Sequence, residues 1–275
     1  MTIPLSASFP SQDWQTHRAA CFRRTTDPFG GFSNMSKAFP LSIYGIRIRS
    51  SEHIYQAMRF TDEPEVQQLV LDAHTPMFSK RVSREWDSIT RSDWMDIRVD
   101  VMRWALRVKL AQHVAAFGDL LKSTRTQPIV EYSRHDEFWG AGPIGDETLR
   151  GQNVLGRLLS ELRDEFLAQP EAAVVVPAPP FPKSKLLGLD IGVLCERDDA
   201  PLITAADLRE AGLPPGPAFG PVLKACVQKQ WNGEFNDRPT GLQIARELWV
   251  AHTQWSVGLA AATSESVFST ESSDC

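Results

Sequence analysis

The sequence predicts an α+β fold that is mostly helical and has few short strands, followed by a small all-α C-terminal module. Three observations support this prediction. Apolar residues recur at helical spacing in several long segments before residue 168. Only one short segment, PLSIYGIRIRS, alternates apolar and polar residues as paired strands do. A proline-rich stretch then divides the chain, whose 275 residues suffice for one or two domains.

Composition sets the expected domain boundaries. The stretch QPEAAVVVPAPPFP contains five prolines, which lack a backbone donor and favour an extended chain. We therefore interpret residues 169–183 as a linker between a first domain at 24–168 and a helical module at 184–255. Residues 256–275 are rich in Ser and Thr and end in an acidic segment, so we expect them to be disordered.

Charge and cysteine usage narrow the class of protein. The net charge of -5 argues against a broad nucleic-acid-binding surface and fits an anionic small molecule held in a local basic pocket. The four cysteines form no C-x-x-C pair, so neither a zinc ribbon nor a disulfide framework is expected. No apolar run approaches the ~20 residues that span a bilayer, and no secretion signal is recognisable. We expect a cytoplasmic protein without membrane contact, metal or cofactor.

A strand pair precedes the first helix. The expected turn between the strands is Tyr44-Gly45. Ser50 or Ser51 then caps a helix, and helical spacing places four polar or aromatic residues on one face: Glu52, Tyr55, Gln56 and Arg59. His53 points elsewhere, so we interpret it as a packing or hydrogen-bonded residue. A zinc motif of the H-x-x-E-H type would need a histidine at position 49, where the chain has Arg49.

Two further helices are expected in the first domain. Ser92 or Asp93 caps one that runs from Trp94 to about Val114, with core spacing at Ile97, Val101, Trp104, Ala105 and Val108. The other runs from about residue 153 to 167, with Leu155, Leu158, Leu159, Leu162 and Phe166 on its apolar face. Lys109 lies about 22 Å along the helix from Trp94 at ~1.5 Å per residue, so we interpret it as structural.

The segment GAGPIG, residues 140–145, matches the dinucleotide-binding fingerprint G-x-G-x-x-G. That fingerprint works as a tight turn between a buried strand and a helix N-terminus. Here the polar residues SRHDEF precede it and a proline lies inside it, so a dinucleotide site is not expected. The segment is interpreted as a glycine-rich loop that lets a ligand approach the backbone closely.

Seven short motifs occur in order between residues 32 and 156. They read FSN at 32–34, EHIYQAMRF at 52–60, TPMFSKRVSR at 75–84, DW at 93–94, ALRVKL at 105–110, DEFWGAG at 136–142 and GQNVLG at 151–156. This series resembles the NADAR (YbiA-like) family and covers roughly half of the chain. The chain departs from the family pattern at Arg59, Ser83 and Leu110. Arg59 stands where the family usually has lysine, and a guanidinium that stays protonated cannot form a Schiff base.

The resemblance implies a YbiA-like domain that hydrolyses an N-glycosidic bond to ribose. The family is similar to N-glycosidases that act on phosphoribosyl intermediates of riboflavin synthesis, or to hydrolases that remove ADP-ribose from guanine. Both reactions develop positive charge at C1 of the ribose, which requires a carboxylate and an acid that helps the base to leave. Glu52 and Asp136 are the candidate carboxylates, with the roles of acid and base left open between them. Trp94 completes the expected catalytic set.

The other candidate residues would bind the substrate. They are Phe32, Ser33, Asn34, Tyr55, Gln56, Arg59, Arg84, Trp139, Gly140 and Asn153. Hydroxyl and amide groups of Ser33 and Asn34 would bind ribose hydroxyls, and two tryptophans, Trp94 and Trp139, would stack on the base. Arg59 and Arg84 would pair with phosphate. Simpler interpretations are a core anchor for Trp94, a turn residue for Asp136 and a surface charge for Arg84.

A non-catalytic module that binds ADP-ribose or a related nucleotide is the alternative function. Arginine in place of lysine at position 59 favours this binder, whereas the presence of both Glu52 and Asp136 favours the enzyme. The expected partner is a small phosphoribosyl or ADP-ribosyl substrate in either case. ADP-ribosylated nucleic acid is a second candidate substrate.

The segment from Leu202 to Asp237 resembles the small helical module near the C-terminus of tRNA nucleotidyltransferases. The shared positions are Asp207, Leu208, Gly212, Pro215, Gly216, Pro217, Gly220 and Leu223. Two short helices joined by a Pro/Gly turn are expected, with Leu223, Val227 and Trp231 as a packing stripe. RNA docking, docking of a protein partner and packing on the first domain are three open roles. The negative net charge favours the last two.

Overall fold

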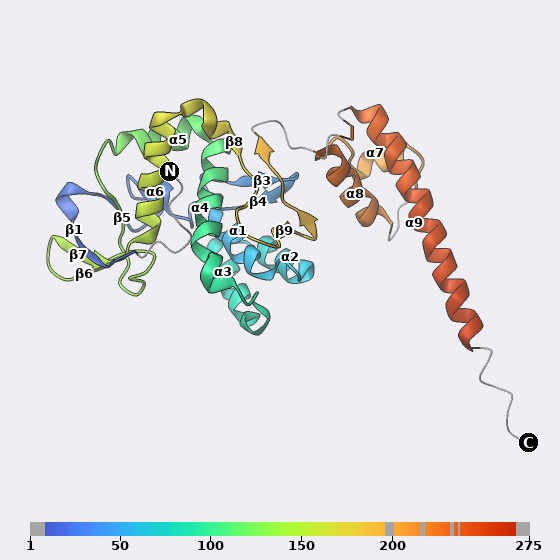
Figure 1. The fold of residues 1–275 in the computed structure, drawn as a ribbon, viewed down its shortest axis with the longest axis horizontal. Helices are drawn as coiled ribbons and strands as arrows, with labels where there is room; N and C mark the ends of the chain where they lie inside the picture. Colours follow the sequence, from blue (N-terminus) through green and yellow to red (C-terminus); the bar gives the residue numbers. More distant parts are fainter. Residues whose placement is uncertain (1–8, 196–200, 215–217, 232–233, 236, 268–275) are drawn as a thin grey trace, which may run out of the picture. The chain divides into compact units, whose positions relative to one another are not determined.

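The structure, a computed structural model, describes residues 9–195, 201–214, 218–231, 234–235 and 237–267 (Figure 1). The chain divides into two compact units, residues 1–199 and 200–275. Among the described residues, no helix combines the length and the apolar character needed to cross a bilayer.

Helices form most of the first unit. The α-helices are α1 (Ser51–Ala57), α2 (Pro64–Asp72), α3 (Pro76–Glu85), α4 (Trp94–Gln112), α5 (Val114–Ser123) and α6 (Val154–Ala168). Short 3-10 helices are η1 (Thr16–Arg18), η2 (Gly30–Phe32), η3 (Met58–Phe60), η4 (Asp87–Ile89) and η5 (Pro170–Val174). In Figure 1, α4 runs through the middle of this unit, and it packs against both α1 and α6.

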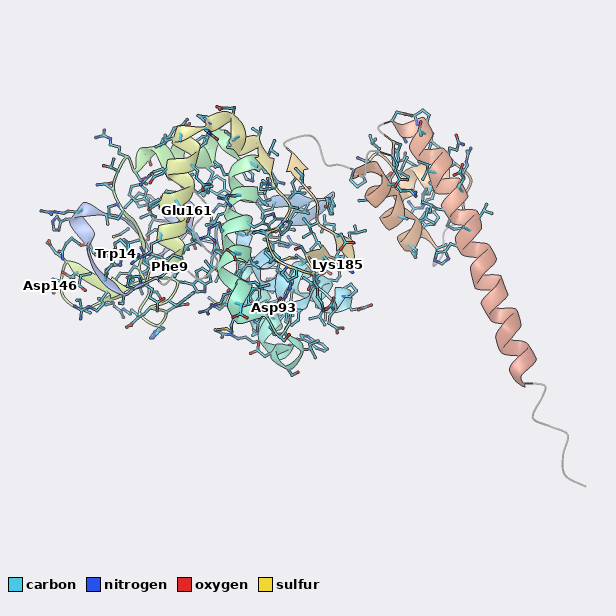
Figure 2. The ribbon with its side chains drawn as sticks, in the orientation of Figure 1. Phe9, Trp14, Asp93, Asp146, Glu161 and Lys185 are labelled. Atoms are coloured by element: carbon cyan, nitrogen blue, oxygen red, sulfur yellow. The ribbon has the colours of Figure 1, made fainter. Side chains whose placement is uncertain are left out.

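The apolar spacing read from the sequence explains this central place of α4. The predicted core residues Val101, Trp104, Ala105 and Val108 are all buried. Asp93, labelled in Figure 2, precedes the helix as expected. Its carboxylate pairs with Arg91 at 2.6 Å and does not cap the helix. Packing of the apolar face, more than capping, therefore holds α4 in place.

Short strands flank the helices. β1 (Gln12–Gln15), β7 (Thr148–Gly151) and β6 (Gly142–Pro143) form an antiparallel sheet in the order β1-β7-β6. β3 (Leu41–Ile43) and β4 (Ile46–Ile48) form the predicted hairpin, in which Tyr44 and Gly45 both have positive φ, as a type I′ turn requires. β2 (Ala20–Phe22) pairs in parallel with β5 (Ile129–Glu131), which joins two segments far apart in sequence.

The expected linker at residues 169–183 belongs to the first unit. The chain there forms η5 and β8 (Val175–Val176), and it continues through β9 (Lys185–Leu186), β10 (Leu189–Asp190) and β11 (Leu194–Cys195). Val176 and Phe181 are buried, and the Phe181 ring packs edge-on to Trp104 at 6.4 Å. Apolar side chains placed between the prolines explain the difference, because they cover α4 and extend the unit to residue 199.

Helices also make up the second unit, as far as the chain there is described. They are α7 (Ala205–Glu210), α8 (Phe219–Trp231) and α9 (Arg238–Val267). Leu208, Val222 and Cys226 form part of its core, with Val227 buried and Leu223 packed against that core. Residues 256–267, expected to be disordered, are helical, and 268–275 lie outside the described residues.

Candidate active site

A cavity of about 540 Å³ lies in the first unit, between α1, the start of α4, the loop after η2, and β5 with the loop that follows it. Nine of the residues proposed from the sequence line it: Ser33, Asn34, Glu52, Tyr55, Gln56, Arg59, Trp94, Asp136 and Trp139. A second hollow of similar volume lies between α4, α6 and η5. The charged residues in its described lining are Arg107 and Glu165, which pair with each other at 2.7 Å. The first cavity is therefore the candidate active site.

The α1 helix supplies one wall of the cavity. Its predicted polar and aromatic face is confirmed, because Glu52, Tyr55 and Gln56 all line the cavity. The backbone N–H of Glu52 donates to the carbonyl of Asn34 at 3.1 Å, which ties the start of α1 to the FSN loop. The Gln56 side chain donates to Glu52 Oε1 at 2.8 Å and so fixes the carboxylate.

His53 has the structural role that its position on the helix predicted. The imidazole is fully buried, with Nδ1 2.9 Å from Ser50 Oγ and Nε2 2.9 Å from the carbonyl of Ala73. Ser50 thus occupies the expected N-cap position, but its hydroxyl bonds the imidazole and does not cap α1. His53 holds the helix in the core and does not reach the cavity.

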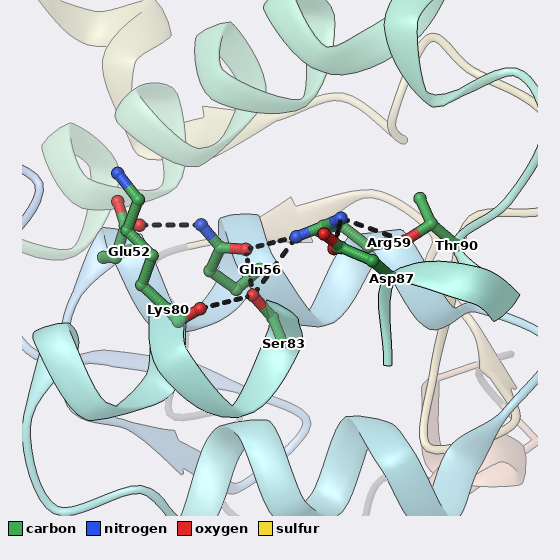
Figure 3. A network of polar contacts seen from close by, with 7 residues as sticks. All are labelled: Glu52, Gln56, Arg59, Lys80, Ser83, Asp87 and Thr90. Atoms are coloured by element: carbon green, nitrogen blue, oxygen red, sulfur yellow. Dashed lines mark hydrogen bonds and ion pairs between the residues drawn. The ribbon is translucent and has the colours of Figure 1, made fainter. Parts of the chain in front are cut away.

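Glu52 is the most buried carboxylate of the site, with 5% of its surface exposed. Burial raises the pKa of Glu52, while the Lys80 ammonium and the Gln56 hydrogen bond act in the opposite direction and the nearby Asp136 carboxylate adds to the rise. Figure 3 shows the Lys80 side chain extending from α3 alongside Glu52. Lys80 therefore partly neutralises the carboxylate without forming an ion pair with it.

Asp136 is a turn residue and also lines the cavity. Its Oδ1 accepts hydrogen bonds from the backbone N–H groups of Phe138 at 3.2 Å and Trp139 at 2.9 Å. The hydroxyl of Ser133 accepts the N–H of Asp136 at 3.0 Å. The turn interpretation and the site interpretation are therefore compatible, since the turn fixes the direction in which the carboxylate points.

Three aromatic rings meet beside the carboxylates. Tyr55 lies between Trp94, at 5.0 Å between ring centroids, and Trp139, at 5.6 Å. The Tyr55 ring is tilted by 56° to Trp94 and by 85° to Trp139, which are arrangements that aromatic pairs favour. Trp94 is at once a core residue and part of the cavity wall.

Arg59 lines the cavity, but its guanidinium is largely occupied by protein groups. One terminal nitrogen donates to Gln56 at 3.3 Å and Ser83 at 3.2 Å, and the other to Asp87 at 2.5 Å and Thr90 at 3.0 Å (Figure 3). The ion pair with Asp87 offsets its charge. The arrangement joins α1 to α3 and η4 and leaves Arg59 poorly placed to pair with phosphate.

Four of the proposed residues do not line the cavity. Phe32 has no exposed surface and packs in the core, with ring centroids 5.9 Å from Phe22 and 6.0 Å from Phe117. Arg84 is exposed on α3. Gly140 lets its backbone pack closely against β5, since a Cβ there would lie 2.7 Å from the carbonyl oxygen of Glu131.

Asn153, the fourth, clamps β5 to the start of α6. Its Nδ2 donates to the carbonyl of Ile129 at 2.8 Å and its Oδ1 accepts the N–H of Glu131 at 3.1 Å. The residue has φ of 49°, in the left-handed region that asparagine tolerates. Gly156 completes the junction, since a Cβ there would lie 2.0 Å from the carbonyl oxygen of Ile129.

Lys109 is structural, as its distance along the helix from Trp94 predicted. Its ammonium is buried and donates to the carbonyls of Gly31 at 2.6 Å and Ser33 at 3.4 Å, with the Phe39 and Phe117 rings beside it. Burial lowers the pKa of Lys109 to about 7. The lysine holds the loop that carries Ser33 and Asn34 into the cavity.

Several cavity residues were not singled out from the sequence. They are Arg23, Met35, Lys80, Met95, Arg98, Met102, Glu131, Tyr132, Ser133 and Phe138. Arg23 stacks on Tyr132 at 5.2 Å, and Arg98 stacks on Phe138 at 3.7 Å. Glu131 reaches the cavity through the parallel pairing of β5 with β2, a long-range contact that no local sequence pattern announces.

Comparison with known proteins identifies the family. The NADAR domain model matches residues 21–167. The chain belongs to the NADAR family. The N-glycosidase YbiA of Escherichia coli is 37% identical over 145 residues, which are 53% of this chain and 86% of that protein. The solution structure of Escherichia coli YbiA aligns with a TM-score of 0.49 and 34% identity, covering 57% of this chain and 89% of that one.

A riboflavin biosynthesis protein of Vibrio vulnificus is a second type of relative. It is 40% identical over 126 residues, which are 46% of this chain and 33% of the relative. The names of these NADAR proteins support a glycosidase-type enzyme activity. The family match ends at residue 167, so the resemblance of the second unit to tRNA nucleotidyltransferases stays a prediction.

Proposed function

We propose that this NADAR protein is an N-glycosidase that cleaves the bond between C1 of a phosphorylated ribose and the nitrogen of its base. The observation that carries the proposal is the meeting of Glu52 and Asp136 in one cavity, next to the rings of Tyr55, Trp94 and Trp139. A pair of carboxylates beside flat rings meets the needs of a positively charged sugar and a planar leaving group.

The carboxylates stabilise the charge that develops as the bond breaks. The transition state of such a reaction resembles an oxocarbenium ion, so nearby negative charge lowers its energy. Asp136 is held by two backbone N–H groups and presents a fixed carboxylate to the sugar. Glu52, held by Gln56, takes a proton from the attacking water.

The FSN loop binds the sugar. Asn34 is only 7% exposed, its Nδ2 faces the sulfur of Met102 at 3.0 Å, and its Oδ1 has no hydrogen-bond partner within the described structure. A buried amide oxygen without a partner costs about 1 to 3 kcal/mol, which a ligand hydroxyl would recover. A ribose hydroxyl donating to Asn34 Oδ1 supplies the missing hydrogen bond.

The phosphate is bound by cations that face the cavity. Lys80, Arg98 and Arg23 line it, and in the described part of the chain none of the three makes an ion pair. The two arginines are already held against aromatic rings, which limits their freedom before the ligand arrives. These three cations take the role that the sequence suggested for Arg59 and Arg84.

Two substrate classes satisfy these contacts. One is a ribosylamine phosphate of the kind formed in riboflavin synthesis, which agrees with the name of the Vibrio vulnificus relative. The other is ADP-ribose attached to guanine, free or in nucleic acid. Both place a flat base, a ribose and at least one phosphate in the cavity.

Incubation of the purified protein with both substrate classes tests the proposal, with mass spectrometry of the released sugar and base. We expect release of base and ribose phosphate, or of base and ADP-ribose, and loss of that release in Glu52→Gln. Binding of either substrate by calorimetry without release of base would instead establish a non-catalytic binding module. The absence of both binding and release across the panel would refute the enzyme and the binding module alike.

A further inference from the structure

Glu131 is an acidic side chain of the cavity that the proposed chemistry has not yet used. It ends β5, lines the same cavity as the two carboxylates already described, and is partly buried. Within the described residues, no hydrogen bond or ion pair ends on its carboxyl group. A partly buried carboxyl in a cavity wall that lacks such a partner favours a bound proton or a ligand.

The three carboxyl groups of the cavity differ in their partners. Glu52 accepts a hydrogen bond from Gln56 and lies near Lys80, and Asp136 accepts two backbone N–H groups. Glu131 also lies near Lys80, but within the described residues its carboxyl group accepts no hydrogen bond. Carboxylates that share a desolvated site repel one another, so the first proton goes to the group whose anion is least stabilised. That group is Glu131.

Electrostatics also favour a proton on Glu131. Burial raises the pKa of Glu131 to about 7, and the Asp136 and Glu52 carboxylates add to the rise, while Lys80 opposes it. These are the charged groups that face Glu131 from the loop after β5, from α1 and from α3. A group that titrates near neutral pH is well suited to give a proton in the transition state.

The backbone around Glu131 is rigidly held. Its N–H donates to Asn153 Oδ1 at 3.1 Å, its carbonyl accepts the N–H of Ala141 at 2.8 Å, and β5 pairs with β2. A proton donor needs a fixed position to reach the leaving atom in the transition state. Glu131 has such a position.

We propose that Glu131 is the general acid of this cavity and delivers a proton to the nitrogen of the base as it leaves. The inference rests on the proposed function and assigns one role within it. The C1–N bond breaks with its electron pair going to the nitrogen, which takes the Glu131 proton. Water then forms a bond to C1 and loses a proton to Glu52. Glu52 releases that proton to solvent and Glu131 regains one, so the sum is addition of water across the C1–N bond.

Leaving-group chemistry tests this role. The variant Glu131→Gln keeps the shape of the side chain but has no proton to give. We expect it to lower kcat/KM at least ~10²-fold on a substrate with an amine or purine leaving group. On p-nitrophenyl ribofuranoside 5-phosphate, whose p-nitrophenolate leaves without protonation, we expect a loss of less than about tenfold. Glu52→Gln should lower both rates alike, because both reactions need charge stabilisation at C1.

A matched control is Glu137→Gln, because Glu137 lies close in sequence, is exposed and does not line the cavity. We expect it to behave as the unaltered protein on both substrates. Equal losses on both substrates in Glu131→Gln would overturn the proton-donor role and assign Glu131 to charge stabilisation or binding. No loss on either substrate would remove it from the reaction altogether.

A second measurement separates this inference from the proposed function. Carbon-13 NMR of the side-chain carboxyl groups follows each titration directly, and Glu131→Gln assigns the Glu131 signal. We expect that signal to titrate near pH 7 in the free protein, whether or not any tested substrate is cleaved. Titration near the ordinary value of about 4.5 would overturn the inference. Absence of cleavage with titration near pH 7 would refute the proposed reaction and leave the protonated carboxyl in place.

Discussion

Replacing Glu131 with glutamine should stabilise the protein at alkaline pH. Between pH 4.5 and about 7, folded Glu131 holds a proton that unfolded Glu131 has released. The folded state therefore binds more protons in this window, and the free energy of unfolding falls as the pH rises through it. Raising a pKa from 4.5 to about 7 corresponds to about 3 kcal/mol, since each tenfold change in proton affinity is worth about 1.4 kcal/mol.

Glutamine resembles the protonated acid and has no proton to release in this pH range. The two proteins should unfold alike near pH 4.5, and the variant should be more stable by up to about 3 kcal/mol at pH 8. Urea unfolding followed by tryptophan fluorescence, at steps between pH 4.5 and 8, measures the difference. Taking the difference at each pH cancels the titration of groups that do not interact with Glu131, such as Lys109. Parallel stability curves for the two proteins across this range would refute the reasoning.

Three other outcomes follow from contacts described above. Glu52→Gln should lower kcat at least ~10²-fold with little change in substrate affinity measured by calorimetry, whereas His53→Gln should cost about 1 to 3 kcal/mol of stability and leave kcat within a few-fold. Lys109→Met should raise KM more than it lowers kcat in steady-state assays, because it frees the loop of Ser33 and Asn34; an unchanged KM would speak against that tether. A chain ending at residue 199 should melt at a higher temperature than one ending at 169, since the latter uncovers Trp104; equal melting temperatures would contradict the packing of residues 170–195 on α4.

Local periodicity predicted the elements that depend on local contacts. The α4 core face, the hairpin at Tyr44-Gly45 and the shared face of Glu52, Tyr55 and Gln56 follow from spacing alone. Spacing could not reveal that Val176 and Phe181 lie on the first unit. Their burial depends on a surface of α4 some seventy residues earlier, whereas proline content in isolation suggests an exposed linker.

Prediction of the candidate site from the sequence has the same limit, because local spacing does not reveal long-range contacts. Asn153 and Phe32 belong to motifs that surround the cavity, but motif membership does not distinguish a ligand contact from a residue that supports one. Glu131 reaches the cavity only because β5 pairs in parallel with β2, more than a hundred residues away in the chain. Arg59 could be placed on the right helix face from the sequence, but its ion pair with Asp87 depends on the fold of η4.

The junction of Asn153, Gly156 and β5 has a consequence for natural sequence variation. A methyl group at position 156 would push α6 away from the carbonyl of Ile129 and disturb the amide clamp on Glu131. Gly156 does not line the cavity, and a surface-based ranking of variants would class a change there as a packing defect. If Glu131 donates the proton, such an allele would impair turnover as well as packing, and a screen for abundance alone would not separate the two effects.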